Sequence, residues 1–276
     1  MNEIRIRNTI FTAMGILAGI KKQLLNVYNY PLLSKEETNA NQKKIRDTEW
    51  KAVAPYIKVG AEFLDVGCGA GYAMHRAATE LNCQVYGIDP DPGGHGVGRT
   101  GSGYTVPVDH IKQAFAESIP FKSNRFDIVY SSHVLEHVND EQQSLREMKR
   151  VLKDDGTFII GMPSASMAWV NLWTQLLFTS HHRFVNFFLS PFITTGKIKF
   201  WQVFVPVPHS FDTHTIFYDI RHYKVENWKK AVSQEFIVEK TLLPAFYPYP
   251  EYRQLFNLKE NRRKSSSVFF ICKKKI

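Results

Sequence analysis

The hydrophobic and polar positions of this chain form short apolar runs separated by segments with helical spacing. The apolar runs predict strands over residues 63–66, 84–89, 126–132, 156–161, 236–243 and 267–273. Helical periodicity and capping residues predict helices over residues 8–27, 43–56, 72–81, 140–153 and 223–234. At 276 residues, the chain is long enough to bury a full core, either as one large domain or as one domain with an insertion.

The first strand ends in an acid and then in three glycines at alternate positions, D-x-G-x-G-x-G from Asp65 to Gly71. Glycine lacks a Cβ atom, so a ligand can lie against this backbone. The helix predicted after the glycines offers unpaired N–H groups and the positive end of its dipole. The turn therefore predicts a site for the polar part of a nucleotide-like ligand, although its spacing differs from the dinucleotide fingerprint G-x-G-x-x-G.

Two further segments follow in order along the chain. The strand over 84–89 ends in Asp89, and residues 126–138 read FDIVYSSHVLEHV. Together with the glycine turn, these segments resemble class I S-adenosylmethionine-dependent methyltransferases of the small-molecule type (methyltransferase domain 11). The resemblance covers residues 50–161 strongly and residues 223–273 more weakly.

This resemblance implies an α/β fold with a doubly wound, seven-stranded, mostly parallel sheet of order 3-2-1-4-5-7-6. It also implies S-adenosylmethionine as cofactor, with the glycine turn under its methionine part and Asp89 on its ribose hydroxyls. The residues expected to bind the cofactor are Asp65, Gly67, Cys68, Gly69, Gly71, Asp89, Pro90, Phe115, Ala116, Glu117 and Ser131.

The expected adenine site departs from the family pattern. Phe115 stands where the family has an aspartate that accepts from the adenine amino group. Phe115 could stack on the base instead, and the acceptor is left open between Glu117, Gln113 and a backbone carbonyl.

Three histidines are candidates for a catalytic base. His133 comes first because it leaves the fourth strand beside the donor site, and His209 and His214 come next because their loop should cover the carboxyl edge of the sheet. A structural role for each is equally open. Residues 133–137 also spell H-x-x-E-H, an inverted zinc-protease motif. That motif requires a long helix, whereas here it follows a strand, so we expect no metal site.

Six glycines fall between Gly93 and Gly103. A phosphate loop is disfavoured because Gly101, Gly103 and Pro107 forbid the helix that it must open. We expect a loop that covers the donor or faces the substrate.

The net charge and the cysteine content limit which partners and which cellular compartment we expect. There are 35 basic and 26 acidic residues, a net charge of +9, so the surface should attract anions. The three cysteines have no paired spacing, which predicts a reducing cytosol without disulfides or structural zinc. We read the C-terminal lysines at 273–275 as a solvated strand end rather than a retrieval signal.

Two segments lie outside the family core. Residues 1–42 read as an amphipathic helix with a linker, and the helix could be a lid, an interfacial membrane helix or a targeting segment. The domain then spans 43–276, with an insertion over 163–215 that has ten aromatics and no acid between Trp169 and Phe204. The insertion reads as a self-packed cap or as a surface for membrane or lipid contact. Its cations are too sparse for a nucleic-acid groove, so a nucleic-acid partner is disfavoured.

These patterns predict a cytoplasmic methyltransferase, peripheral on an anionic membrane, that acts on an apolar or lipid-linked small molecule. A soluble methyltransferase of a sugar or other polar metabolite is the first rival. A binding protein with the same fold and no catalysis is the second.

Overall fold

The computed structural model describes residues 33–94, 108–179, 206, 208–210, 214–247, 250–251 and 264–275. The helix predicted over 8–27, most of the glycine-rich segment and most of the aromatic insertion lie outside these residues. No helix in the described ranges is both long enough and apolar enough to cross a membrane.

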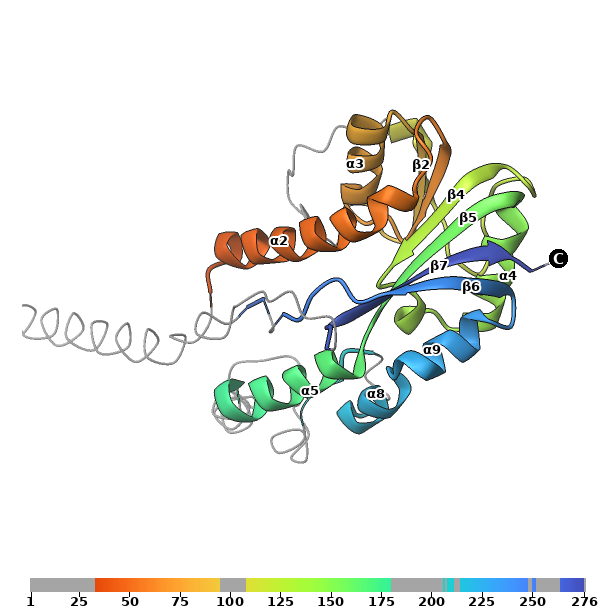
Figure 1. Cartoon of the computed structure of the whole chain (residues 1–276). Helices are drawn as coiled ribbons and strands as arrows, with labels where there is room; N and C mark the ends of the chain where they lie inside the picture. Colours follow the sequence, from red (N-terminus) through yellow and green to blue (C-terminus); the bar gives the residue numbers. More distant parts are fainter. Residues whose placement is uncertain are drawn as a thin grey trace, which may run out of the picture.

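A seven-stranded sheet runs through the centre of the molecule (Figure 1). Its strands are β1 Glu62–Val66, β2 Gln84–Asp89, β3 Ile111–Gln113, β4 Phe126–Ser132, β5 Leu152–Pro163, β6 Phe236–Leu242 and β7 Ser267–Lys274. Their order is β3-β2-β1-β4-β5-β7-β6, and only β7 runs antiparallel to its two neighbours. The fold and strand order expected from the family resemblance are confirmed.

The register of the central strands determines where a ligand can bind. Val66, the last residue of β1, pairs with Ile88 of β2 on one side and with Ser131 of β4 on the other. The carboxyl ends of β1, β2 and β4 therefore meet at one edge, where the strand order also reverses. Open α/β sheets bind ligands at such a switch point.

Helices cover both faces of the sheet (Figure 1). The α-helices are α2 Lys35–Val53, α3 Tyr72–Leu81, α4 Glu141–Val151, α5 Ala165–Thr174, α8 Ile216–His222 and α9 Val225–Val232. Three 3₁₀ turns, η1 Ala54–Tyr56, η2 Val108–His110 and η3 Leu135–His137, and a π segment, η4 Gln175–Thr179, complete the helical elements. Side chains of α2 and α3 pack in the core of one face, and those of α4 and α9 pack in the core of the other.

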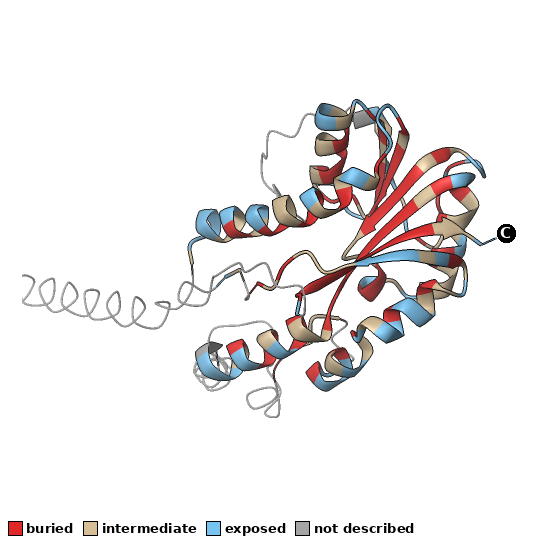
Figure 2. Ribbon diagram, in the orientation of Figure 1, coloured by how far each residue is buried: buried red, intermediate tan, exposed pale blue. Residues whose placement is uncertain are grey.

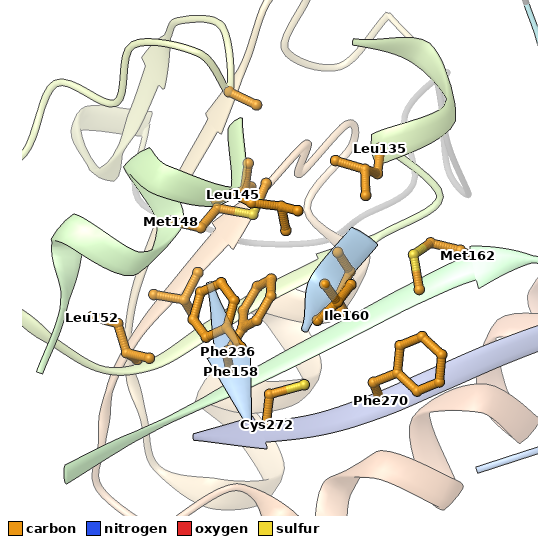
Figure 3. Packing of buried hydrophobic residues seen from close by; sticks show 14 of the residues in the cluster. Leu135, Leu145, Met148, Leu152, Phe158, Ile160, Met162, Phe236, Phe270 and Cys272 are labelled. Atoms are coloured by element: carbon orange, nitrogen blue, oxygen red, sulfur yellow. The ribbon is translucent and has the colours of Figure 1, made fainter. Parts of the chain in front are cut away.

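Side chains alternate between these two cores along each strand, as the pleat of a strand requires. In β5, Phe158 and Ile160 belong to the α4–α9 side, while Ile159 lies on the α2–α3 side. Figure 2 shows the buried residues concentrated on the sheet, and Figure 3 shows the α4–α9 core, where Phe158 stacks on Phe236.

Among the differences from the sequence prediction, three are explained by residues that cap helices. Residues 35–42, read there as a linker, are the start of α2, because Ser34 and Glu37 form a capping box that begins the helix early. Helix α4 starts at Glu141, one residue later than predicted, since Asp140 caps it. Helix α8 occupies a segment that was expected to be a loop, and Thr215 caps it.

Candidate active site

The glycine turn after β1 has the backbone that its sequence requires. Gly67, Gly69 and Gly71 all have φ between +49° and +84°, a region in which side chains are strained. A Cβ atom on Gly67 would lie 2.1 Å from Val134 Cγ2. The turn thus brings bare main chain to the switch point, directly before helix α3.

Asp89 holds this turn in place. Its side chain is fully buried, its Oδ2 accepts a hydrogen bond from the Gly69 N–H at 2.8 Å, and its Oδ1 accepts from the Asp91 N–H at 2.8 Å. Hydrogen bonds to a charged acceptor are the stronger ones. The carboxylate is therefore fixed in orientation beside the glycines.

A cavity of about 710 Å³ opens over this edge of the sheet. Eleven of the fourteen predicted site residues line it: Asp65, Gly67, Cys68, Gly69, Asp89, Pro90, Phe115, Ala116, Glu117, His133 and His209. A volume in this range is typical of small-molecule and cofactor sites. Residues that the sequence analysis took from separate segments thus meet around one cavity.

Three predicted residues are not among those that line the cavity. Ser131 points to the opposite face of the sheet, because side chains alternate along β4 and its neighbours Tyr130 and Ser132 face the cavity. Gly71 lies at the cap of α3, behind the turn. His214 stacks on Tyr218, with ring centroids 3.9 Å apart, away from the other two histidines.

Asp65 is a buried acid at the floor of the cavity. Burial, with a further contribution from the nearby Asp89 carboxylate, raises the pKa of Asp65 to about 8. Two carboxylates facing one cavity favour a ligand that carries positive charge. Binding of such a ligand would restore the ionised form of Asp65.

The structure narrows the choice of adenine contacts. The Phe115 side chain lines the cavity and remains 62% exposed, so its ring face is available for stacking. Gln113 lies outside the lining, and its amide donates to the Pro90 carbonyl at 2.8 Å. Glu117 lines the cavity while its Oε1 accepts from the Asn139 N–H.

His133 lines the cavity at the end away from the glycine turn. It has φ +57°, the left-handed conformation, and its N–H donates to the Gly161 carbonyl. Such outliers in non-glycine residues concentrate at functional sites. The ring lies between two buried carboxylates, with Nε2 3.5 Å from Glu49 Oε1 and Nδ1 3.5 Å from Glu136 Oε1.

Glu49 is a site residue that the sequence analysis missed. It comes from α2, is 1% exposed, forms an ion pair with Arg46 at 2.6 Å and accepts a hydrogen bond from the Tyr247 hydroxyl at 3.2 Å. Burial would raise the pKa of Glu49, but Arg46 and His133 outweigh it and lower that pKa to about 2. No local motif marks Glu49, because its partners lie on distant parts of the chain.

The roof of the cavity also comes from outside the family core. Met167 and Val170 of α5 line it together with His209, all within the predicted insertion, and Gln42 and Ile45 of α2 line it from the other side. The insertion therefore contributes directly to the cavity wall in its described part.

The residues present fit S-adenosylmethionine. Gly67 and Gly69 of the glycine turn line the cavity, the fixed Asp89 carboxylate suits a diol, and the Asp65–Asp89 pair suits a cation. An exposed ring at Phe115 completes a surface for a base. These features define a nucleotide-type donor site in a doubly wound α/β fold.

Comparison with known proteins shows which family the central part of the chain resembles. Residues 64–160 match the methyltransferase domain family. A solved structure from Listeria monocytogenes, assigned to the S-adenosylmethionine-dependent methyltransferases, has the same fold with a TM-score of 0.52 and 18% identity, and covers 84% of this chain and all of that one. Residues 64–160 are therefore similar to the methyltransferase domain family, and the fold of the chain is the one found in S-adenosylmethionine-dependent methyltransferases.

Curated relatives match less than half of the length of this chain. The tRNA U34 carboxymethyltransferase of Saccharophagus degradans is 32% identical over 124 residues, which cover 41% of this chain and 36% of the relative. The ubiquinone biosynthesis O-methyltransferase of Azorhizobium caulinodans is 32% identical over 102 residues, covering 37% and 40%. The chain thus spans little more than a third of the length of these relatives, and the two relatives differ in their acceptors.

Proposed function

We propose that this protein transfers a methyl group from S-adenosylmethionine to an apolar or lipid-linked small molecule at the cytoplasmic surface of a membrane. The observation that carries the proposal is a single cavity with two distinct ends. One end is the glycine turn with Asp65 and Asp89, and the other lies under α5, whose outer face carries exposed tryptophans.

Each end has a separate task in this reaction. When bound, S-adenosylmethionine supplies a methyl group that its sulfonium already activates. The chain must then hold the donor in one orientation, align the acceptor with it and keep water out. The fixed Asp89 serves the first task, and the roof from α2 and α5 serves the last two.

The apolar acceptor is supported by the surface next to the cavity. On α5, Trp169 is 47% exposed and Trp173 is 56% exposed, one turn apart, while Met167 and Val170 of the same helix line the cavity. Phe217, on the adjacent helix α8, is 56% exposed. Tryptophans at such positions are typical of membrane-interface surfaces.

The net charge of the protein also supports the proposed location at a membrane surface. The net charge is +9, and helix α9, which follows α8 in the chain, carries exposed Lys229 and Lys230. A basic surface favours contact with anionic lipid headgroups.

Incubation with methyl-labelled S-adenosylmethionine and total cell extract tests the reaction. We expect the label in the organic, lipid-soluble phase, because the acceptor end of the cavity is roofed by apolar side chains. Label in the aqueous metabolite fraction would instead favour a soluble methyltransferase of a polar acceptor. Label in RNA would favour an RNA acceptor, the class of substrate named for the tRNA U34 carboxymethyltransferase relative. Donor binding without transfer to any fraction would support a binding protein.

Vesicle flotation tests the membrane clause. We expect the full chain to float with anionic vesicles and the double variant Trp169→Ser/Trp173→Ser to lose most of this binding, since each buried aromatic contributes about 1.5–3 kcal/mol. The matched control is Val59→Ser/Ile237→Ser, which removes two exposed apolar side chains, 67% and 55% exposed, from the opposite edge of the sheet. Equal flotation of both double variants, or no flotation of the wild type, would contradict the membrane location.

A further inference from the structure

Three side chains with metal-binding atoms converge at the acceptor end of the cavity. They are His133 at the end of β4, Glu136 in the 3₁₀ turn η3, and His209 from the insertion, and one ligand atom of each lies within 4.8 Å of the others. Glu136 Oε1 is 3.5 Å from His133 Nδ1 and 4.0 Å from His209 Nε2. We call these three residues the His–Glu–His cluster.

All of these separations are long for hydrogen bonds, and the 3.5 Å separation between Glu136 Oε1 and His133 Nδ1 suits two ligands of a shared ion. Charge-assisted N–H···O bonds are about 2.7–2.9 Å long. Two ligand atoms that each lie about 2.0–2.2 Å from one tetrahedral ion are about 3.3–3.6 Å apart. Small side-chain rotations would bring the cluster to this geometry.

The cluster also contains buried polar atoms that lack partners. The Glu136 side chain has no exposed area, and neither of its carboxylate oxygens has a hydrogen-bond partner among the described residues. His133 Nε2 is likewise without a hydrogen bond there, and that side chain is 9% exposed. A buried carboxylate without hydrogen bonds costs several kcal/mol, which a bound cation would offset.

The surroundings of His133 match those of a metal-ligating histidine. Such a histidine binds the metal through one ring nitrogen and directs the other toward a carboxylate. Here Nδ1 faces Glu136, while Nε2 faces Glu49 at 3.5 Å. Arg46 and Tyr247 hold Glu49 in turn, so the second carboxylate is fixed in position.

We propose that the His–Glu–His cluster binds one divalent transition-metal ion of the zinc type. Two imidazoles and one carboxylate are a known zinc ligand set, whereas magnesium and calcium prefer oxygen ligands alone. His137, whose Nε2 is 4.0 Å from Glu136 Oε1, stands beside the cluster as a candidate fourth ligand.

The sequence analysis expected no metal at H-x-x-E-H because that segment does not form a long helix. The structure supplies a third ligand, His209, from another part of the chain. His133 and His209 both line the cavity, so an open coordination position would face the acceptor. A role in binding an acceptor oxygen rests on the proposed methyl transfer, whereas the metal site itself does not.

Metal binding by the full-length protein, free of any affinity tag and treated with a chelator, tests the proposal without the donor. We expect about one equivalent of Zn²⁺ by calorimetry and visible absorption bands with Co²⁺. Glu136→Gln and His209→Ala should each weaken Zn²⁺ binding by at least about 10-fold. The matched control is His222→Asn, because His222 pairs with Glu141 at 3.0 Å without a third metal-binding side chain among the described residues, and this variant should bind Zn²⁺ like the wild type.

Thermal unfolding distinguishes a variant that has lost metal binding from one that is misfolded. Zn²⁺ should raise the melting temperature of the wild type and of His222→Asn, but not that of His209→Ala. The proposal is overturned if the wild type takes up no Zn²⁺, or if Glu136→Gln and His209→Ala bind it as tightly as the wild type. Calorimetry with S-adenosylmethionine alone keeps the two proposals separable, because donor binding can persist when the metal site fails.

Discussion

Replacing Asp89 with alanine is expected to weaken S-adenosylmethionine binding by at least about 100-fold. The reason is that the two charge-assisted hydrogen bonds expected between the Asp89 carboxylate and the ribose hydroxyls of the donor, about 1.5–3 kcal/mol each, are lost. The Asp89 carboxylate accepts from the Gly69 and Asp91 N–H groups, and Asp89 lines the cavity. The variant therefore loses both a ligand contact and the restraint on the glycine turn. Isothermal calorimetry of the donor measures the change.

The neighbouring acid provides the control for this variant. Asp91 is exposed, lies outside the cavity lining and contributes its backbone N–H, which alanine retains. Asp91→Ala should therefore bind the donor within a few-fold of the wild type. If Asp89→Ala folds normally and still binds the donor like the wild type, the site lies elsewhere.

Replacing Asp65 with asparagine is expected to stabilise the ligand-free protein at pH 8 while weakening donor binding. The pKa of Asp65 is raised to about 8 in the folded protein, above its usual 3.8, so the stability it contributes is fully present below pH 3.8. That contribution is lost as the pH rises through 8. At about 1.4 kcal/mol per pKa unit, the ceiling of the gain is about 6 kcal/mol, and we expect at least about 2 kcal/mol after relaxation.

The measurement is the free energy of unfolding by urea, compared between variant and wild type from pH 4 to 8. The stabilisation by Asp65→Asn should grow with pH across this range. Asp127→Asn is a control of opposite sign: burial alone would raise the pKa of Asp127, but its contact with Lys153 at 2.8 Å outweighs burial and lowers it. That variant should be less stable than the wild type at pH 8. A flat difference for Asp65→Asn would refute the raised pKa.

Asp65 also shows how function and stability are linked at this site. A buried acid costs stability at neutral pH until a cation arrives to stabilise its ionised form. We expect Asp65→Asn to weaken donor binding by about 10-fold, since it removes the carboxyl group that a bound cation would stabilise in its ionised form. The cavity floor is therefore arranged for its ligand at the expense of the free protein.

The strands and the donor end of the cavity could be predicted because their signals are local. The bounds of β2, β4 and α3 agree with the apolar runs and periodicity that predicted them, and the three glycines adopt the positive φ angles that their spacing indicated. Errors arose where neighbouring residues offered competing signals. Ser34 and Glu37 started α2 early, and Ser131 was chosen although the pleat turns Ser132 toward the cavity.

What the sequence by itself determined is the donor side: the strand ends, the glycine turn, Asp65 and Asp89, all of which depend on residues close together in the chain. Only the tertiary structure decided the acceptor side. Glu49 from α2 and His209 from the insertion reach His133 only because helices and loops pack over the sheet edge. Which distant side chains meet there depends on how those elements dock, and no spacing in the sequence specifies that docking.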